Sequence, residues 1–115
     1  MPFETKQTDL ASGVVVLVVT GSMTMGGELQ RFEWQVERLI KENKNRLVLE
    51  ASQLTYLDSA GIGVLVKISG LAKGAGGRLH LAAPTERVMN TLKMVSLDTL
   101  LAIDASLDAA VAALG

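Results

Sequence analysis

The sequence contains no cysteine, a single histidine and very few aromatic residues, and each shortage removes a class of function. Without cysteine the chain can form neither disulfides nor thiolate zinc sites, and it has no thiol nucleophile. The one histidine, His80, has no second histidine with which to share a zinc ion, and no Asp/Asn-rich run resembles a calcium loop. We therefore expect no resident metal or cofactor, and a core built from Val, Leu, Ile, Met and Ala.

A strong charge of one sign and a long apolar run are also missing. The formal net charge is −1 with acidic and basic residues interspersed, so the electrostatic footprint of a nucleic-acid-binding protein is absent. The apolar run at 14–19 has the length of a strand, whereas a membrane span needs about 18 apolar residues. The first residues, Met-Pro-Phe-Glu, are not typical of a signal peptide. We expect a cytoplasmic protein that binds neither nucleic acid nor membranes.

Length and composition predict one globular domain over residues 1–115. The chain is 49% hydrophobic and 20% charged, which argues against disorder. Strand-like runs alternate with helical patterns, and this predicts an α/β fold: a mixed sheet of four to five strands with about four helices packed on it. Strands are expected at 3–8, 14–19, 46–51, 78–83 and 100–103. Helices are expected at 28–43, at 59–73, after Thr85 and after Ser106, with loops at 21–27 and 52–53 and a glycine-rich turn at 73–77.

The chain is organised around the stretch at 54–66, where Asp58 and Ser59 stand at the predicted change from loop to helix. One of their side-chain oxygens can accept a bond from a free backbone N–H at the helix start. The first turns then carry Gly61 and Gly63, although each glycine costs a helix roughly 1 kcal/mol relative to alanine. Glycines kept beside a hydroxyl indicate a need for close access to it.

A helical wheel divides this predicted helix into two faces. One face is apolar and should pack on the sheet. The other is a nearly side-chain-free stripe with a hydroxyl at its upper end, which would let another backbone approach closely. The alternative is that the glycines let the helix sit tightly on its own sheet and that Ser59 is only an N-cap. The apolar face comprises Ile62, Leu65, Ile68, Leu71 and Ala72, and the stripe comprises Ser59, Gly63, Val66 and Gly70, with Ala60 and Lys67 beside it.

No catalytic constellation can be assembled from the sequence. A triad of Ser59, His80 and Asp58 would lack the Gly-x-Ser-x-Gly elbow in which such a serine is usually held. The segment Gly61-Ile62-Gly63 lacks the third glycine of a dinucleotide-binding loop, and there is no Gly-Lys-Ser/Thr of a phosphate-binding loop. We therefore expect a protein that is not an enzyme.

The motif Asp58-Ser59-Ala60-Gly61-Ile62-Gly63-Val64-Leu65, preceded by Leu54-Thr55-Tyr56-Leu57, resembles the signature of the STAS-domain family. The best-known soluble members of that family are bacterial anti-sigma factor antagonists. The order of the elements and the Gly76-Gly77 turn also resemble the family, so the likeness covers residues 8–114. In these antagonists the serine after the aspartate is phosphorylated by the partner anti-sigma factor, which is itself a serine kinase. The resemblance implies that this serine is Ser59.

The resemblance also implies a regulatory cycle. The unmodified protein would sequester the anti-sigma factor and free a sigma factor for transcription. The phosphorylated form would be released, and a metal-dependent serine phosphatase would reset it. ATP and magnesium would belong to the kinase, and the chain would be a monomer or weak dimer. The predicted partner-binding residues are Asp58, Ser59, Ala60, Gly61, Gly63, Val66, Lys67, Gly70, Ser22 and Thr24.

One position departs from the family pattern. Family antagonists commonly carry an aspartate within a Gly-x-Leu-Asp pattern, whereas this chain has Gly21-Ser22-Met23-Thr24, with Thr24 in the place of the aspartate. If that aspartate shapes the kinase-facing surface, this chain binds a different partner or is phosphorylated poorly. Equally, the neutral Thr24 removes a negative charge near Ser59 and eases the acceptance of a phosphate. The alternative function is a STAS adaptor subunit of a lipid-transport or signalling assembly, in which Ser59 is not phosphorylated.

Overall fold

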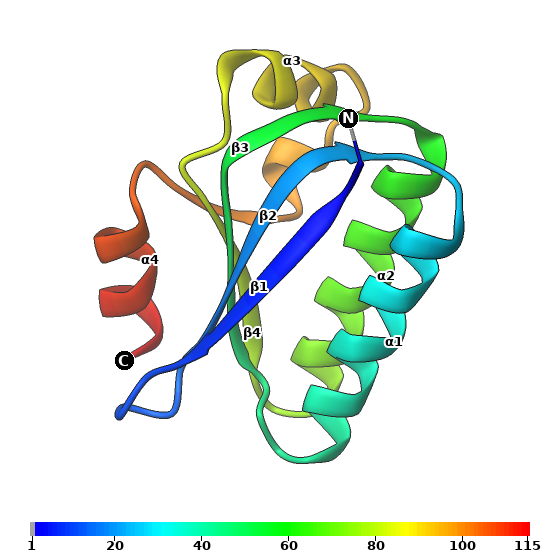
Figure 1. The fold of residues 1–115 in the computed structure, drawn as a ribbon. Coiled ribbons are helices and arrows are strands. Elements are labelled where there is room, and N and C mark those ends of the chain that lie inside the picture. Colours follow the sequence, from blue (N-terminus) through cyan, green and yellow to red (C-terminus); the bar gives the residue numbers. More distant parts are fainter. Residues whose placement is uncertain (1) are drawn as a thin grey trace.

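A five-stranded mixed sheet forms the centre of the molecule. A computed structural model describes residues 2–115, and its strands lie in the order β1-β2-β3-β4-β5 (Figure 1). The first strand runs antiparallel to the second, and the other pairs are parallel. The sheet confirms the predicted α/β fold. The strands are β1 (Glu4–Asp9), β2 (Val15–Met23), β3 (Arg46–Leu57), β4 (Arg78–Ala82) and β5 (Ala102–Asp104).

Helices cover both faces of the sheet. Figure 1 shows α1 and α2 side by side on one face, α4 on the opposite face, and α3 over the carboxyl end of β3. Within residues 2–115, none of these helices combines the length and the apolar character that crossing a membrane would require. The helices are α1 (Gly27–Lys41), α2 (Ser59–Gly74), α3 (Glu86–Met94) and α4 (Leu107–Leu114), and a short 3-10 helix, η1 (Leu97–Thr99), follows α3.

Burial on both faces explains why the central strands read as continuous apolar runs. In β3, Leu47 and Leu49 enter the larger core beneath α1 and α2, whereas Val48 between them enters the smaller core beneath α4. The smaller core joins Val48 to Val16 of β2 and Ala110 of α4. Two helical layers therefore fix the sheet from either side.

The predicted loops at 21–27 and 52–53 are partly wrong, because both segments contain strand. β2 continues to Met23, and β3 continues to Leu57. The register of this parallel pair shifts twice, each time by one extra residue in β3. The first shift lies between the pairs Val18–Glu50 and Thr20–Gln53. The second lies between the pairs Gly21–Leu54 and Ser22–Tyr56. The polar residues expected to form a loop thus form bulges, which bend a strand and raise its twist without ending it.

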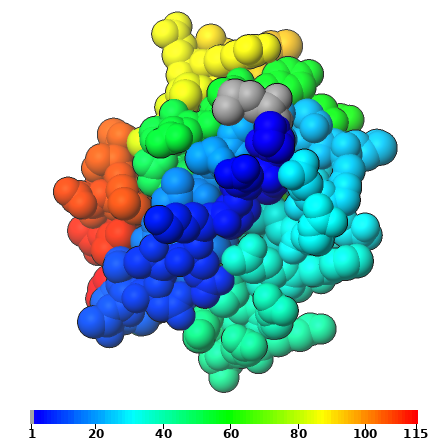
Figure 2. Space-filling view, viewed as in Figure 1, coloured from blue at the N-terminus to red at the C-terminus, as the bar shows by residue number. Residues whose placement is uncertain are grey.

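The outer edge strand is protected by polar side chains. Figure 2 shows β1 lying across the surface between α1 and α4. Asp9 at its end pairs with Lys44 at 3.1 Å, and Gln7 accepts a hydrogen bond from Gln35 of α1 at 3.0 Å. Polar and charged side chains on an edge strand oppose the addition of a further strand. The edge at β1 is therefore poorly suited to pairing with a strand of another chain.

Candidate functional site

Asp58 joins the start of α2 to the loop after β2. Its backbone is extended, and its Oδ1 accepts a hydrogen bond from the backbone N–H of Gly61 at 2.9 Å, which makes it the N-cap of α2. Its Oδ2 accepts a second bond from the backbone N–H of Met25, also at 2.9 Å. These two N–H groups, Met25 first and Gly61 second, lower the pKa of the Asp58 carboxyl. One carboxylate therefore fixes two segments that are far apart in the sequence.

Ser59 is the first residue of α2, and its side chain is exposed. Within residues 2–115 its hydroxyl makes no hydrogen bond, since the capping bond to Gly61 comes from Asp58. The interpretation of Ser59 as the N-cap is therefore wrong for the structural reason that Asp58 occupies the capping position. The hydroxyl is left accessible at the amino end of a helix.

The glycines of α2 have two different structural roles. Gly61 is buried, and a Cβ there would lie 2.2 Å from the carbonyl oxygen of Met23. Gly63 and Gly70 are exposed, and a Cβ at either would meet no atom within 4 Å. The alternative that glycine lets the helix sit tightly on its own sheet holds for Gly61. The structure therefore corrects the prediction for Gly61, which contacts its own chain and is not available to a partner.

The stripe defined by Ser59, Gly63, Val66 and Gly70 lies on the solvent side of α2, and Val66 is 44% exposed. The predicted packing face needs one correction: Leu71 is 40% exposed, whereas Val64 is buried. Val64 and Leu71 are seven residues apart and so lie on the same side of the helix, which means that the buried side is the predicted one and only the depth of burial along it differs. The buried residues of α2 are Gly61, Val64, Leu65, Ile68 and Ala72.

Lys67 faces α1 and is held by two carboxylates. Its Nζ forms ion pairs with Glu33 and with Glu37, the latter at 3.1 Å. Hydrogen bonds from Lys67 to Glu33 and then to Glu37 raise the pKa of the lysine. Lys67 is thus part of the contact between the two helices, and a partner would have to displace these glutamates to use its charge.

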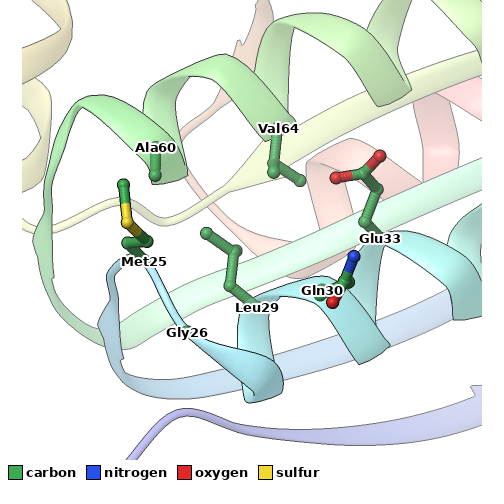
Figure 3. A pocket seen from close by; sticks show the side chains of 7 residues that line it. All are labelled: Met25, Gly26, Leu29, Gln30, Glu33, Ala60 and Val64. Atoms are coloured by element: carbon green, nitrogen blue, oxygen red, sulfur yellow. The ribbon is translucent and has the colours of Figure 1, made fainter.

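A pocket of about 400 Å³ opens between the amino ends of α1 and α2. Figure 3 shows Ala60 and Val64 of α2 facing Leu29 and Glu33 of α1 across it, with Met25 at one end. Met25 is 81% exposed although it is a large apolar residue. Sequence reasoning missed Met25, and the only signal was an apolar residue in a glycine-containing loop.

Ser22 and Thr24 lie at the carboxyl end of β2, and both are half-buried. The Ser22 hydroxyl is 3.4 Å from that of Thr55, which itself donates to the carbonyl of Gly21 at 3.0 Å. Thr24 directly precedes Met25, whose N–H binds Asp58. The structure therefore holds the loop after β2 against the start of α2. Ser22 and Thr24 thus lie at the same edge of the sheet as Asp58 and Ser59, the other predicted site residues at the start of α2.

His80 and Asp58, the two residues considered as partners of Ser59 in a catalytic triad, are engaged elsewhere. His80 Nδ1 lies 2.6 Å from Oδ2 of Asp104 and bridges β4 and β5. Both carboxylate oxygens of Asp58 accept backbone N–H groups, so neither orients a histidine toward Ser59. Within the described residues, no three His, Cys, Asp or Glu side chains are grouped as a metal site would need.

Replacing Asp58 with alanine should lower the free energy of unfolding by about 1–2 kcal/mol, because a helix cap and the bond to Met25 are both lost. Urea unfolding at pH 7 measures this loss.

The lowered pKa of Asp58 means that its carboxylate stabilises the fold above the unfolded-state pKa, near 3.9, and that this contribution is lost as the pH falls through the folded-state pKa. The stability gap between wild type and Asp58→Asn should therefore narrow below about pH 4. If the stability difference between wild type and Asp58→Asn did not change with pH, the ionised Asp58 carboxylate could not be the group that stabilises the start of α2.

Comparison with known proteins gives a consistent result. The family model described as the STAS domain matches residues 5–110. A candidate anti-sigma factor antagonist of Thermotoga neapolitana is 26% identical over 94 residues, which are 82% of this chain and 83% of that protein. The crystal structure of a candidate anti-sigma factor antagonist from Thermotoga maritima has a TM-score of 0.83 at 25% identity, and covers 97% of this chain and 93% of that one. The Bacillus protein SpoIIAA in its phosphorylated form shares the fold, with a TM-score of 0.77 at 15% identity and coverage of 97% and 100%.

Proposed function

The chain belongs to the STAS-domain family, and from that premise we propose that it is an anti-sigma factor antagonist switched by phosphorylation of Ser59. The observation that carries the proposal is the exposed Ser59 hydroxyl at the first position of α2, which is free because Asp58 supplies the cap. The relatives named as anti-sigma factor antagonists support the choice of function. The partner is an anti-sigma factor with serine kinase activity, encountered in the cytoplasm. The chain itself has no enzymatic role in the proposal.

The switch adds charge where the fold tolerates it. The kinase would transfer the γ-phosphoryl group of ATP to the Ser59 oxygen, with loss of the hydroxyl proton and release of ADP. The phosphate then lies at the amino end of α2, where free N–H groups and the helix dipole favour an anion. A metal-dependent phosphatase would return the serine by hydrolysis. The fold is therefore preserved in both states.

The charge of a phosphate on Ser59 would weaken the binding of the anti-sigma kinase to the stripe on α2. A phosphate carries about −1.5 to −2 charges at pH 7, and it would stand beside the ionised Asp58. The stripe with Gly63 has open space where side chains would otherwise stand, which suits a closely approaching partner backbone. A dianion at the end of that stripe has to be desolvated for the partner to dock, and this is costly. Phosphorylation would thus release the partner without unfolding the chain.

Thr24 bears on how well the kinase accepts this chain. It lies in the loop that Asp58 holds through Met25, so a residue at this position borders the switch. Because Thr24 is neutral, it adds no second negative charge to that of Asp58, which directly precedes Ser59 in the sequence. We propose that Thr24 eases the acceptance of the phosphate and changes which kinase is recognised.

The test is intact-mass analysis after incubation with ATP, magnesium and each candidate anti-sigma kinase of the source organism. Wild type should gain one phosphate, and Ser59→Ala should gain none. The Ser59→Thr variant is the matched control, because it keeps a hydroxyl at the same position and should still be modified. If no candidate phosphorylates the wild type while the chain still binds another protein stably, the switch is refuted and the adaptor function gains support.

A further inference from the structure

A second groove runs along α2, between this helix and the segment that connects α3 to β5. Two adjoining hollows of about 180 and 70 Å³ form it, and we call it the α2–η1 groove. Two large apolar side chains are exposed on its walls: Val66 of α2 is 44% exposed, and Leu100 is 74% exposed. The residues that line the groove are Val66, Ser69, Gly70, Lys73, Arg78, Leu79, Leu97, Leu100, Leu101 and Ala102.

The charge of the α2–η1 groove is unbalanced. Lys73 and Arg78 lie at one end of it, and no carboxylate is among the lining residues. Within residues 2–115 neither cation forms an ion pair, in contrast to Lys67, which two glutamates of α1 hold on the other side of α2. Lys67 on the α1 side of the helix is thus neutralised by its ion pairs, whereas the η1 side offers two cations without an ion pair in the described residues.

The dimensions of the groove favour a protein segment over a small molecule. Both hollows are smaller than the roughly 300–1,000 Å³ of typical ligand pockets. A Cβ at Gly70 would meet no atom within 4 Å, so a side chain from another molecule has room there. Apolar walls with a charged end match an amphipathic helix that places its apolar face into a groove.

We infer that the α2–η1 groove binds an amphipathic helix of a protein partner, with apolar side chains against Val66 and Leu100 and acidic residues at the end near Lys73 and Arg78. The groove is continuous with the Ser59 stripe, because Val66 and Gly70 belong to both. The inference rests on the proposed function for the identity of the partner, the anti-sigma kinase. It adds the chemistry by which that partner is recognised away from Ser59.

The first test measures the affinity of the anti-sigma kinase for a Lys73→Glu/Arg78→Glu double variant by titration calorimetry at low salt. Affinity should fall at least about tenfold, because complementary charges become repulsive. Lys41→Glu is the control. Lys41, like Lys73, is an exposed lysine in the last turn of a helix, so replacing it with glutamate has the same unfavourable interaction with a helix dipole, but on α1 and away from the groove. It should change affinity less than about twofold. Phosphorylation of Ser59 together with unchanged affinity in the double variant would overturn the groove inference and leave the proposed function standing.

The second test needs no kinase. The 15N-labelled chain is titrated with an about 15-residue amphipathic helical peptide that carries leucines on one face and glutamates at one end. Amide shifts should move at Val66, Gly70 and Leu100, and the double variant or a peptide with lysines for the glutamates should abolish the change. No shifts with the acidic peptide would overturn the inference. Binding of the wild type, but not the double variant, to phosphatidylglycerol vesicles in a sedimentation assay would also overturn it, since the groove would then bind lipid.

Discussion

Replacing Gly61 with alanine is expected to lower the free energy of unfolding by about 2–3 kcal/mol. The new Cβ would lie 2.2 Å from the Met23 carbonyl oxygen and 3.0 Å from the Met23 Cγ. The carbonyl belongs to the end of β2, which is paired with β3, so it cannot move away without disturbing the sheet. Either the amino end of α2 shifts or the strand end does, and both changes also strain the bonds that Asp58 makes.

The matched control is the same substitution two residues later. Gly63→Ala adds a methyl group in open space, so the variant should gain about 1 kcal/mol from the better helix propensity of alanine. The two variants should therefore differ by about 3–4 kcal/mol in urea unfolding at pH 7, although both change glycine to alanine in one helix. Equal stabilities would contradict the assignment of Gly61 as the contact between helix and sheet.

The elements of the fold could be predicted because their signals are local. The run at 14–19 is apolar throughout, the run at 46–51 is apolar except for Arg46 and Glu50, and both faces of the corresponding strands contain buried residues. The starts of α3 and α4 could also be predicted, because an N-cap side chain bonds a backbone N–H only three residues later in the sequence. The Thr85 hydroxyl accepts from the N–H of Val88 at 3.2 Å, and the Ser106 hydroxyl accepts from the N–H of Ala109 at 3.1 Å.

The ends of the central strands could not be predicted because their pairing is not local. Residues 21–23 and 52–57 are partly polar, and their strand conformation depends on a partner strand about 33 residues away. Two bulges keep the strands paired while the register changes, and a sequence pattern of strict alternation does not reveal a bulge. The consequence reaches the site, since the extension of β2 through Met23 is what buries Gly61.

The sequence was sufficient to choose the position of the candidate site, but not to assign the roles of its residues. The sequence places Asp58 and Ser59 together at the start of a helix, and either residue type caps helices well. Only the backbone decides between them: Asp58 is extended, whereas Ser59 is already helical. The second bond of Asp58, to the N–H of Met25, joins residues 33 apart and has no signal in the sequence.

Ser59→Glu is expected to lower the affinity for the anti-sigma kinase about 100-fold, which corresponds to the cost of burying an unpaired charge at an interface. The variant should keep or slightly raise the melting temperature, because a carboxylate in the first turn of α2 interacts favourably with the helix dipole. Calorimetric titration and thermal unfolding measure the two effects separately. Ser59→Ala, which adds no charge, should bind like the wild type.

The position of the added charge, and not the charge itself, must account for this loss. Ala109→Glu is a matched control, because it adds the same carboxylate to the first turn of α4 on the opposite face of the sheet. Ala109 is exposed, and a glutamate there would complete a capping box with Ser106, so this variant should be as stable as the wild type or more so. It should bind the kinase normally. If Ala109→Glu weakens binding as much as Ser59→Glu, the partner responds to net charge and not to a group at the start of α2. If neither variant weakens binding, the kinase docks away from Ser59, and phosphorylation of this serine could not release it.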